Sequence, residues 1–152
     1  LRTLGNARDI EDLTQEAFLV IIRRAGAIRE PAALPSFVVG VAIRVARGEI
    51  RKRRLRRFVG LDEENAPAVS KGADEVTRQR VARVYEVLDQ LDTDARLAFV
   101  LRHIEGHELT ETAELCGVSL ATIKRKLAKA EKRFMAISRG DPVLRDLVGP
   151  ET

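Results

Sequence analysis

The sequence predicts an all-α protein made of two small helical domains joined by a flexible linker. Apolar residues recur at helical spacing through most of the chain, which is the pattern of amphipathic helices. β-branched residues are frequent but follow the same spacing, so no strand pattern competes with the helices. The stretch 58–74 loses this periodicity and contains glycine, proline and several acidic residues, which is typical of a flexible linker.

The first domain is expected over residues 1–57 and contains two helices. The first helix runs from about Arg8 to Ala25. Pro35 suits the first turn of the second helix, which extends to about Arg57 and is roughly 35 Å long. The apolar stripe of the first helix consists of Ile10, Leu13, Ala17, Val20 and Ile21. That of the second helix consists of Val38, Val41, Ala42 and Val45.

The second domain is expected over residues 75–138, with residues 139–152 as a C-terminal tail. Its second helix follows Asp92 or Thr93, either of which suits an N-cap, and ends at Gly106. A short helix and a last, longer helix come next. The apolar positions of the second domain are Val81, Val84, Leu88, Leu91, Leu97, Val100, Leu101, Ile104, Ile123, Leu127, Ala130 and Phe134.

Composition narrows the classes of protein to which the chain can belong. It has 152 residues, of which 45% are hydrophobic, and this argues against wholesale disorder. No apolar run approaches the ~18 residues that a membrane helix needs, so no membrane insertion is expected. The single cysteine excludes an internal disulfide and suits a reducing cytoplasm.

The net charge of +4 conceals two strongly basic clusters. Between Arg44 and Arg57, eight basic residues oppose one acid, Glu49, for a local charge of +7. Between Ser119 and Arg133, six oppose one acid, for a local charge of +5. Each cluster lies on an expected helix, one per domain, and has the charge that polyanion binding requires.

Four arginines of the first cluster form a narrow row on the helix, nearly opposite its apolar stripe. A solvated helix face is the alternative interpretation, but the planar guanidinium fork suits phosphate, so arginine here favours nucleic acid. A membrane surface fits less well because the apolar stripe is mainly valine and alanine. The row consists of Arg44, Arg47, Arg51 and Arg54.

The second cluster coincides with a helix-turn-helix pattern. Ala113 is small where two helices cross, and Gly117 allows the positive φ of a sharp turn. Val118 and Ile123 fill the space between the helices, and Ser119 caps the second one. An ordinary helical hairpin is the alternative, but the charge favours DNA in the major groove. The outward positions are Leu120, Ala121, Lys124, Arg125 and Ala128.

These residues resemble the extracytoplasmic-function (ECF, group 4) sigma factors of bacterial RNA polymerase. The segment ARDIEDLTQEAFLVII is similar to the part of region 2 that docks on the polymerase clamp. The segment FVVGVAIRVARGEIRKRR is similar to the promoter-melting helix that follows it in the family. The region 4 pattern aligns without gaps with the segment from LDQLDTDARL to AEKRF. The resemblance covers nearly all of the chain except linker and tail.

The resemblance implies a sigma factor that directs core polymerase to promoters by reading −10 and −35 elements, not an enzyme and without a cofactor. It implies three partners: promoter DNA, an anti-sigma factor, and core RNA polymerase through the clamp of the largest subunit and the flap of the second-largest. The expected location is cytoplasmic, on the nucleoid when in holoenzyme.

Carried over position by position, the resemblance also implies site residues. The core-polymerase contact would use Asp9, Asp12, Leu13, Gln15, Glu16 and Phe18. The −10 element would be melted and bound by Phe37, Arg44, Arg47, Arg51 and Arg54. The −35 element would be bound by Ser119, Leu120, Lys124, Arg125, Lys126 and Lys129. Ordinary core packing is an equally open role for Leu13, Phe18 and Phe37.

Four departures from the family pattern indicate a divergent member. Arg44 stands where Asn is usual, and Gly48 where Asp is common. Thr112 replaces an apolar residue, and Glu108 replaces the usual capping Ser. Only LRTLG remains of the family's first helix, and the chain begins with Leu rather than Met, so we expect a truncated start.

Two other functions remain as alternatives: an independent helix-turn-helix regulator that binds operators as a dimer, and a sigma mimic that titrates an anti-sigma factor. Catalysis or a metal site has little support because His103 and His107 lack an obvious third ligand. We expect both histidines to be exposed to solvent. Cys116 is expected to be a buried structural thiol.

Overall fold

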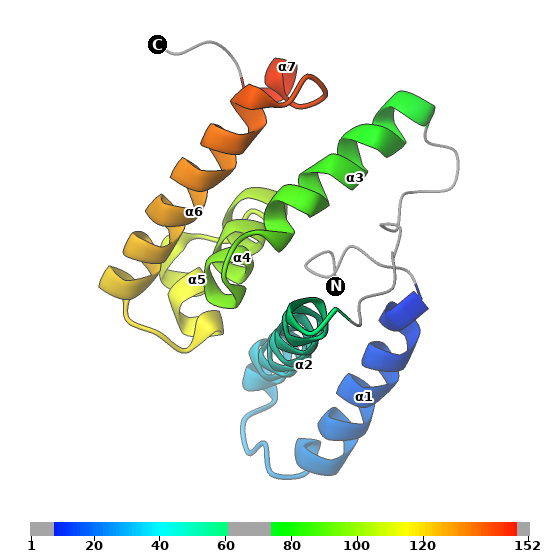
Figure 1. The fold of residues 1–152 in the computed structure, drawn as a ribbon. Helices are drawn as coiled ribbons and strands as arrows, with labels where there is room; N and C mark the ends of the chain where they lie inside the picture. Colours follow the sequence, from blue (N-terminus) through cyan, green and yellow to red (C-terminus); the bar gives the residue numbers. More distant parts are fainter. Residues whose placement is uncertain (1–7, 61–73, 149–152) are drawn as a thin grey trace.

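The computed structural model describes residues 8–60 and 74–148, and all regular structure in these ranges is helical (Figure 1), which confirms the predicted fold class. The first module consists of α1 (Arg8–Ala25), the short η1 (Pro31–Ala33) and α2 (Leu34–Phe58). The predicted truncated start, LRTLG, and most of the predicted linker 58–74 lie outside the described residues. No helix within the described ranges is both long and apolar enough to cross a membrane.

The second module follows the predicted order of elements. It consists of α3 (Glu75–Asp89), α4 (Thr93–Phe99) continuing into the π-helical turn η2 (Val100–Ile104), α5 (Leu109–Cys116), α6 (Leu120–Gly140) and α7 (Arg145–Val148). Asp92 caps α4 by accepting a hydrogen bond from the Ala95 backbone N–H. Of the two residues that suit this cap in the sequence, Asp92 is therefore the one that occupies the N-cap position. Gly106 has a φ of +79°, which lets the chain turn sharply after η2.

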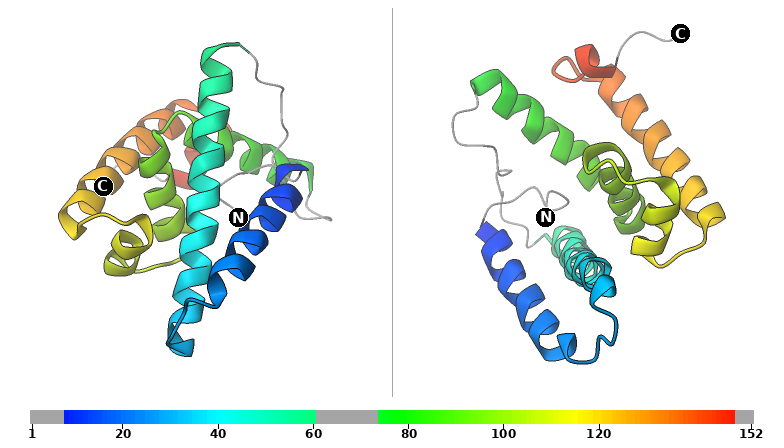
Figure 2. Two further views of the ribbon diagram at one scale, coloured as in Figure 1. Left: turned by 90° about the horizontal axis from the view of Figure 1, so that it is seen from below. Right: turned by 180° about the vertical axis from the view of Figure 1, so that it is seen from behind.

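The long helix α2 is packed on two sides. It contacts α1 on one side and α4 and α5 of the second module on the other, as the two views in Figure 2 show. The α1 side carries Val41 and Val45, which line a groove together with Leu13 and Val20 of α1. Buried residues of both modules therefore form one continuous apolar cluster, a contact between the two predicted domains that the sequence analysis did not anticipate.

The C-terminal segment is more ordered than the predicted tail. The helix α6 continues to Gly140, and Leu144 beyond it is fully buried. The Asp141 carboxylate accepts hydrogen bonds from the backbone N–H groups of Val143 and Leu144, and Arg83 of α3 donates to the same carboxylate. The hydrogen bond from Arg83 is the main cause that holds the pKa of Asp141 below its ordinary range. Residues 141–148 thus close one end of the second module.

We predict that Leu144→Ala destabilises the protein by about 2–5 kcal/mol, because the substitution leaves a cavity in a site that excludes solvent. The matched control is Leu55→Ala, at a leucine of α2 that is 64% exposed, where the expected change is below about 0.5 kcal/mol. Urea unfolding followed by circular dichroism measures both values. Equal effects of the two substitutions would show that the C-terminal segment is a tail.

Candidate nucleic-acid interface

The helix-turn-helix has the geometry that the sequence predicts. Gly117 follows α5 with a φ of +66°, and Ser119 caps α6, its hydroxyl accepting from the Thr122 backbone N–H at 3.2 Å. Ala113 and Ile123 are buried where the two helices meet. The five predicted outward positions are all exposed: Leu120, Ala121, Lys124, Arg125 and Ala128. The N-terminal half of α6 therefore presents a basic surface fixed by a sharp turn.

The departures at Glu108 and Thr112 have local structural consequences. Glu108 occupies the N-cap position of α5, but its side chain makes no capping hydrogen bond. Thr112 is fully buried, and its hydroxyl donates to the Glu108 backbone carbonyl at 2.8 Å. A polar side chain is therefore tolerated at this buried position because its one donor is satisfied within the helix.

The arginine row on α2 is divided by its contacts. Arg44, Arg51 and Arg54 are exposed, as a row facing a partner requires. The Arg47 side chain is only 24% exposed, and it reaches the second module: its Nη2 donates to the backbone carbonyl of Cys116 at 2.8 Å. The Arg47 Nε also lies 3.3 Å from the Asp94 carboxylate. The predicted DNA-facing residue Arg47 thus makes an intramolecular contact that helical spacing alone did not predict.

One carboxylate, Asp94 of α4, connects the two basic clusters. It pairs with Arg47 of α2 and accepts a hydrogen bond from Lys126 Nζ of α6 at 3.0 Å. Burial raises the pKa of Asp94, but the hydrogen bond and charge of Lys126 and the charges of Arg47 and Arg51 outweigh burial, so the pKa lies below its ordinary value of 3.8. This carboxylate therefore favours the folded arrangement above pH 3.8, and the contribution is lost as the pH falls through the lowered pKa.

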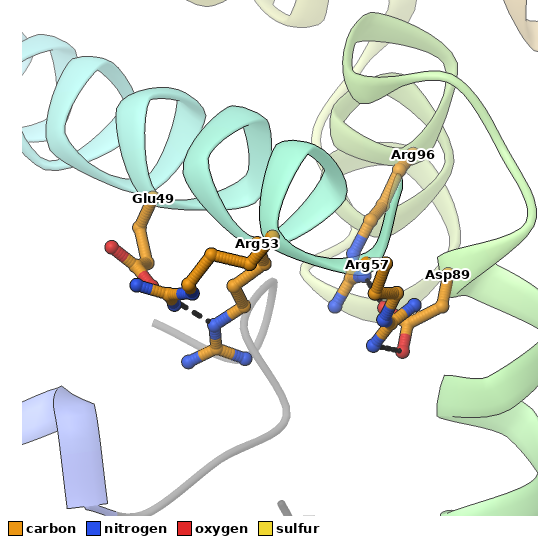
Figure 3. Close-up of polar contacts among 6 residues, drawn as sticks. Glu49, Arg53, Arg57, Asp89 and Arg96 are labelled. Atoms are coloured by element: carbon orange, nitrogen blue, oxygen red, sulfur yellow. Dashed lines mark hydrogen bonds and ion pairs between the residues drawn. The ribbon is translucent and has the colours of Figure 1, made fainter. Parts of the chain in front are cut away.

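Other carboxylates pair with three arginines in the C-terminal half of α2 (Figure 3). Glu49 is buried and accepts from Arg53 at 3.1 Å and from Arg56 at 2.9 Å. Asp89 at the end of α3 binds Arg57 of α2 and also the buried Arg96 of α4. Arg57 and Asp89 form a second ion pair between the two modules, about three helical turns beyond Arg47.

The predicted core-polymerase residues lie on two faces of α1. Leu13 is buried against the apolar cluster, so core packing is its role in this fold. Phe18 is 58% exposed and is therefore not a core residue. Asp9 lies in the first turn of α1, and its side chain is outside the part of the chain that the structure describes. The remaining three predicted residues are exposed on the outer face: Asp12, Gln15 and Glu16.

Four residues that the sequence analysis considered for stacking, thiol or metal chemistry have ordinary surroundings. Phe37 is half-buried and packs against the apolar cluster. Cys116 is buried, and burial raises the pKa of its thiol, which therefore stays protonated at neutral pH. His103 is exposed as expected and pairs with Glu131, whereas His107 is half-buried and pairs with Glu111. Among the described residues, no cluster of three or more His, Cys, Asp or Glu side chains suits a metal ion.

We predict that Glu108→Ser stabilises the protein by about 0.5–1 kcal/mol, because a serine hydroxyl supplies the missing N-cap hydrogen bond of α5. The control is Glu114→Ser, which makes the same substitution at an exposed position inside α5 and is expected to be neutral or slightly destabilising. Thermal unfolding of the two variants measures the difference. A stabilisation shared by both variants would point to removal of negative charge rather than to capping.

Comparison with known proteins identifies the two modules. Residues 1–56 match the model of Sigma-70 region 2, and residues 82–134 match that of Sigma-70, region 4. The ECF RNA polymerase sigma factor EcfG of Rhodopseudomonas palustris is 26% identical, over 88% of this chain and 73% of its own length. The RNA polymerase sigma factor SigV of Bacillus subtilis is 28% identical, over 84% of this chain and 74% of its own length.

A solved structure has the same fold. It is that of the sigma factor RpoE in complex with the anti-sigma factor NepR from Bartonella quintana. RpoE is 18% identical to this chain, and the two superpose with a TM-score of 0.69 over 92% of this chain and 87% of that one. With a region 2 module followed by a region 4 module, the chain belongs to the ECF sigma factors of bacterial RNA polymerase.

Proposed function

We propose that this ECF sigma factor guides core polymerase by reading a −35 element with α6 and a −10 element with α2. The observation that carries the proposal is the helix-turn-helix, which holds exposed Lys124 and Arg125 on the first turns of a capped helix. Lysine and arginine at such positions reach phosphates and the acceptor edge of guanine in the major groove. Lys129, one turn further, is exposed and suits a phosphate contact.

The −10 element is assigned to α2. Its exposed Arg44, Arg51 and Arg54 supply a row of guanidinium groups that fits a phosphate backbone. Phe37 lies near the start of the same helix and is half-buried, so one part of its ring is free to stack on an unpaired base. Arg47 belongs to the row by position and becomes available when its contact with the second module opens.

The outer face of α1 suits a protein partner, which we assign as the clamp of core polymerase. Three polar side chains of this face, Asp12, Gln15 and Glu16, are exposed, and so is an apolar group that the fold leaves uncovered. The apolar group consists of Phe18, Leu19 and Ile22, which are 58%, 54% and 71% exposed. A mixed apolar and acidic surface of this kind is typical of a docking site.

An anti-sigma factor is the further partner that we propose. The RpoE structure that shares this fold contains the anti-sigma factor NepR. The present chain likewise exposes an apolar group on α1 and two basic helices, and an inhibitor that covers them would hold it inactive.

The deciding experiment is in-vitro transcription with core polymerase on a promoter library. We expect initiation that depends on the added chain and selects two sequence elements. An independent regulator would instead bind operators specifically without polymerase. A sigma mimic would bind an anti-sigma factor and support no initiation. Absence of promoter-dependent initiation would overturn the proposed function.

We predict that Lys124→Ala and Arg125→Ala each weaken binding of the holoenzyme to promoter DNA by about 1–3 kcal/mol if the side chain reads a base. If the side chain contacts only phosphate, its replacement by alanine should instead reduce the slope of log K against log salt concentration by about 1. Arg78→Ala, on exposed α3, is the matched control for charge. Equal losses at all three positions would indicate non-specific attraction.

We predict that Phe18→Ala lowers the affinity for core polymerase by about 1–4 kcal/mol, as expected for an aromatic side chain at the centre of a docking site. Stability should hardly change, because the ring is more than half exposed. Phe58→Ala, at a phenylalanine of α2 that is 87% exposed, is the matched control and should leave core binding unchanged. Fluorescence titration with core polymerase measures both. An unchanged affinity for Phe18→Ala would remove this ring from the interface.

A further inference from the structure

Three basic residues on two helices converge on one groove, which we call the basic groove. Arg54 of α2 lines it together with Lys129 and Arg133 of α6, and its volume is about 240 Å³. Lys129 and Arg133 are four residues apart and therefore share a face of α6, where like charges repel each other. Among the described residues, no carboxylate forms an ion pair with any of the three. The one acid that lines the groove is Asp92, whose Oδ1 accepts the Ala95 backbone N–H. An anion bound in the basic groove would therefore relieve a repulsion that the fold leaves in place.

A second, mainly apolar groove adjoins the basic groove at the C-terminal end of α2. The volume of this apolar groove is about 730 Å³, and its lining includes Phe58 and Leu55, which are 87% and 64% exposed. Arg54 lines both grooves, and Asp92 of the basic groove is followed directly in the chain by Thr93 of the apolar groove. The two grooves therefore meet along a common edge, so one small molecule can occupy both.

The apolar groove has the chemistry that binds a flat ring. A phenyl ring as exposed as that of Phe58 gains contact when another ring stacks on it. Arg51 and Arg57 line the same groove, and a planar guanidinium also stacks on aromatic faces. Thr93, which is only 7% exposed, adds a hydroxyl that can donate to or accept from a polar ring edge. A heterocyclic ring with polar edges therefore fits this groove better than an aliphatic chain.

The basic groove favours phosphate over carboxylate. The planar fork of an arginine pairs with two phosphate oxygens at once, and Arg54 and Arg133 offer two such forks. A diphosphate or triphosphate concentrates its negative charges in a small volume, whereas an acidic peptide spreads its carboxylates along a backbone. A short polyphosphate is therefore the anion that fits three converging cations best.

We propose that the two grooves together bind a nucleoside polyphosphate, with its phosphates between Arg54, Lys129 and Arg133 and its base stacked on Phe58. This binding goes beyond the proposed function and does not depend on it. One consequence does rest on the proposed function: Arg54 and Lys129 are residues that we assign to promoter DNA, so the nucleotide and DNA compete for them.

The test measures the fluorescence anisotropy of ATP that carries a fluorescent label on its ribose, titrated with the free full-length chain. The titration uses about 0.15 M salt, at which long-range attraction between exposed charges is largely screened. We expect saturable binding, and unlabelled ATP should displace the probe. Inorganic tripolyphosphate should bind at least about tenfold more weakly than ATP because it lacks the ring, and adenosine more weakly still because it lacks the phosphates. Duplex DNA should also displace the probe.

Two substitutions separate the phosphate part of the site from the ring part. Lys129→Ala should weaken ATP binding about three- to tenfold, and Lys132→Ala, at an exposed lysine of α6 outside the groove, is the matched control. Phe58→Ala should weaken ATP binding about five- to a hundredfold and leave the affinity for tripolyphosphate unchanged. Phe18→Ala on α1 is its matched control. All four residues are exposed, and circular dichroism checks that each variant keeps its helical content.

Four results would overturn the inference. ATP fails to bind, or Lys132→Ala weakens binding as much as Lys129→Ala, which indicates non-specific attraction. Tripolyphosphate binds as tightly as ATP, which indicates a plain anion site, or polyglutamate displaces the probe better than tripolyphosphate, which assigns the groove to an acidic protein segment. Failure of DNA alone to displace the probe would remove only the competition with promoter DNA. These measurements use no polymerase, so a chain that binds ATP and supports no initiation would refute the proposed function and leave the nucleotide site standing.

Discussion

The packing of α2 on two opposite sides is the constraint on which the rest of the structure depends. Val41 and Val45 hold it against α1, and buried residues on another side hold it against α4 and α5. Because α2 is packed on two opposite sides, only its remaining faces are exposed to solvent. The side that remains open carries Arg44, Arg51 and Arg54, and this is the surface available to DNA.

Electrostatics explains how two basic clusters are tolerated in one small protein. Three carboxylates lie beside arginines of α2: Glu49 within α2, Asp94 on α4 and Asp89 at the end of α3. Only Glu49 lies in the same sequence cluster as the cations that it neutralises. The other two come from the second module, so the tertiary contact offsets part of the charge on α2. Replacing such carboxylates by DNA phosphates exchanges one set of charge-assisted hydrogen bonds for another.

The helices and the helix-turn-helix were predictable from sequence because they rest on local rules. Apolar spacing located α1 and α2 to within one or two residues, and Gly117 and Ser119 specified the turn and the cap. The contact of Arg47 with Asp94 was not predictable, because periodicity places Arg47 in the arginine row without indicating which neighbour packs there. Nor does any local pattern mark Leu144 as buried, although the fold excludes it fully from solvent.

Energy transfer between dyes on the two modules, compared in the free protein and in the complex with core polymerase and promoter, tests whether α2 stays packed on the second module. Ala32→Cys before α2 and Ala136→Cys on α6 place the dyes at exposed positions, and the native Cys116 is buried. We expect efficient transfer in the free chain and a marked loss of transfer in the promoter complex. The same efficiency in both states would contradict the assignment of α2 and α6 to two separate promoter elements.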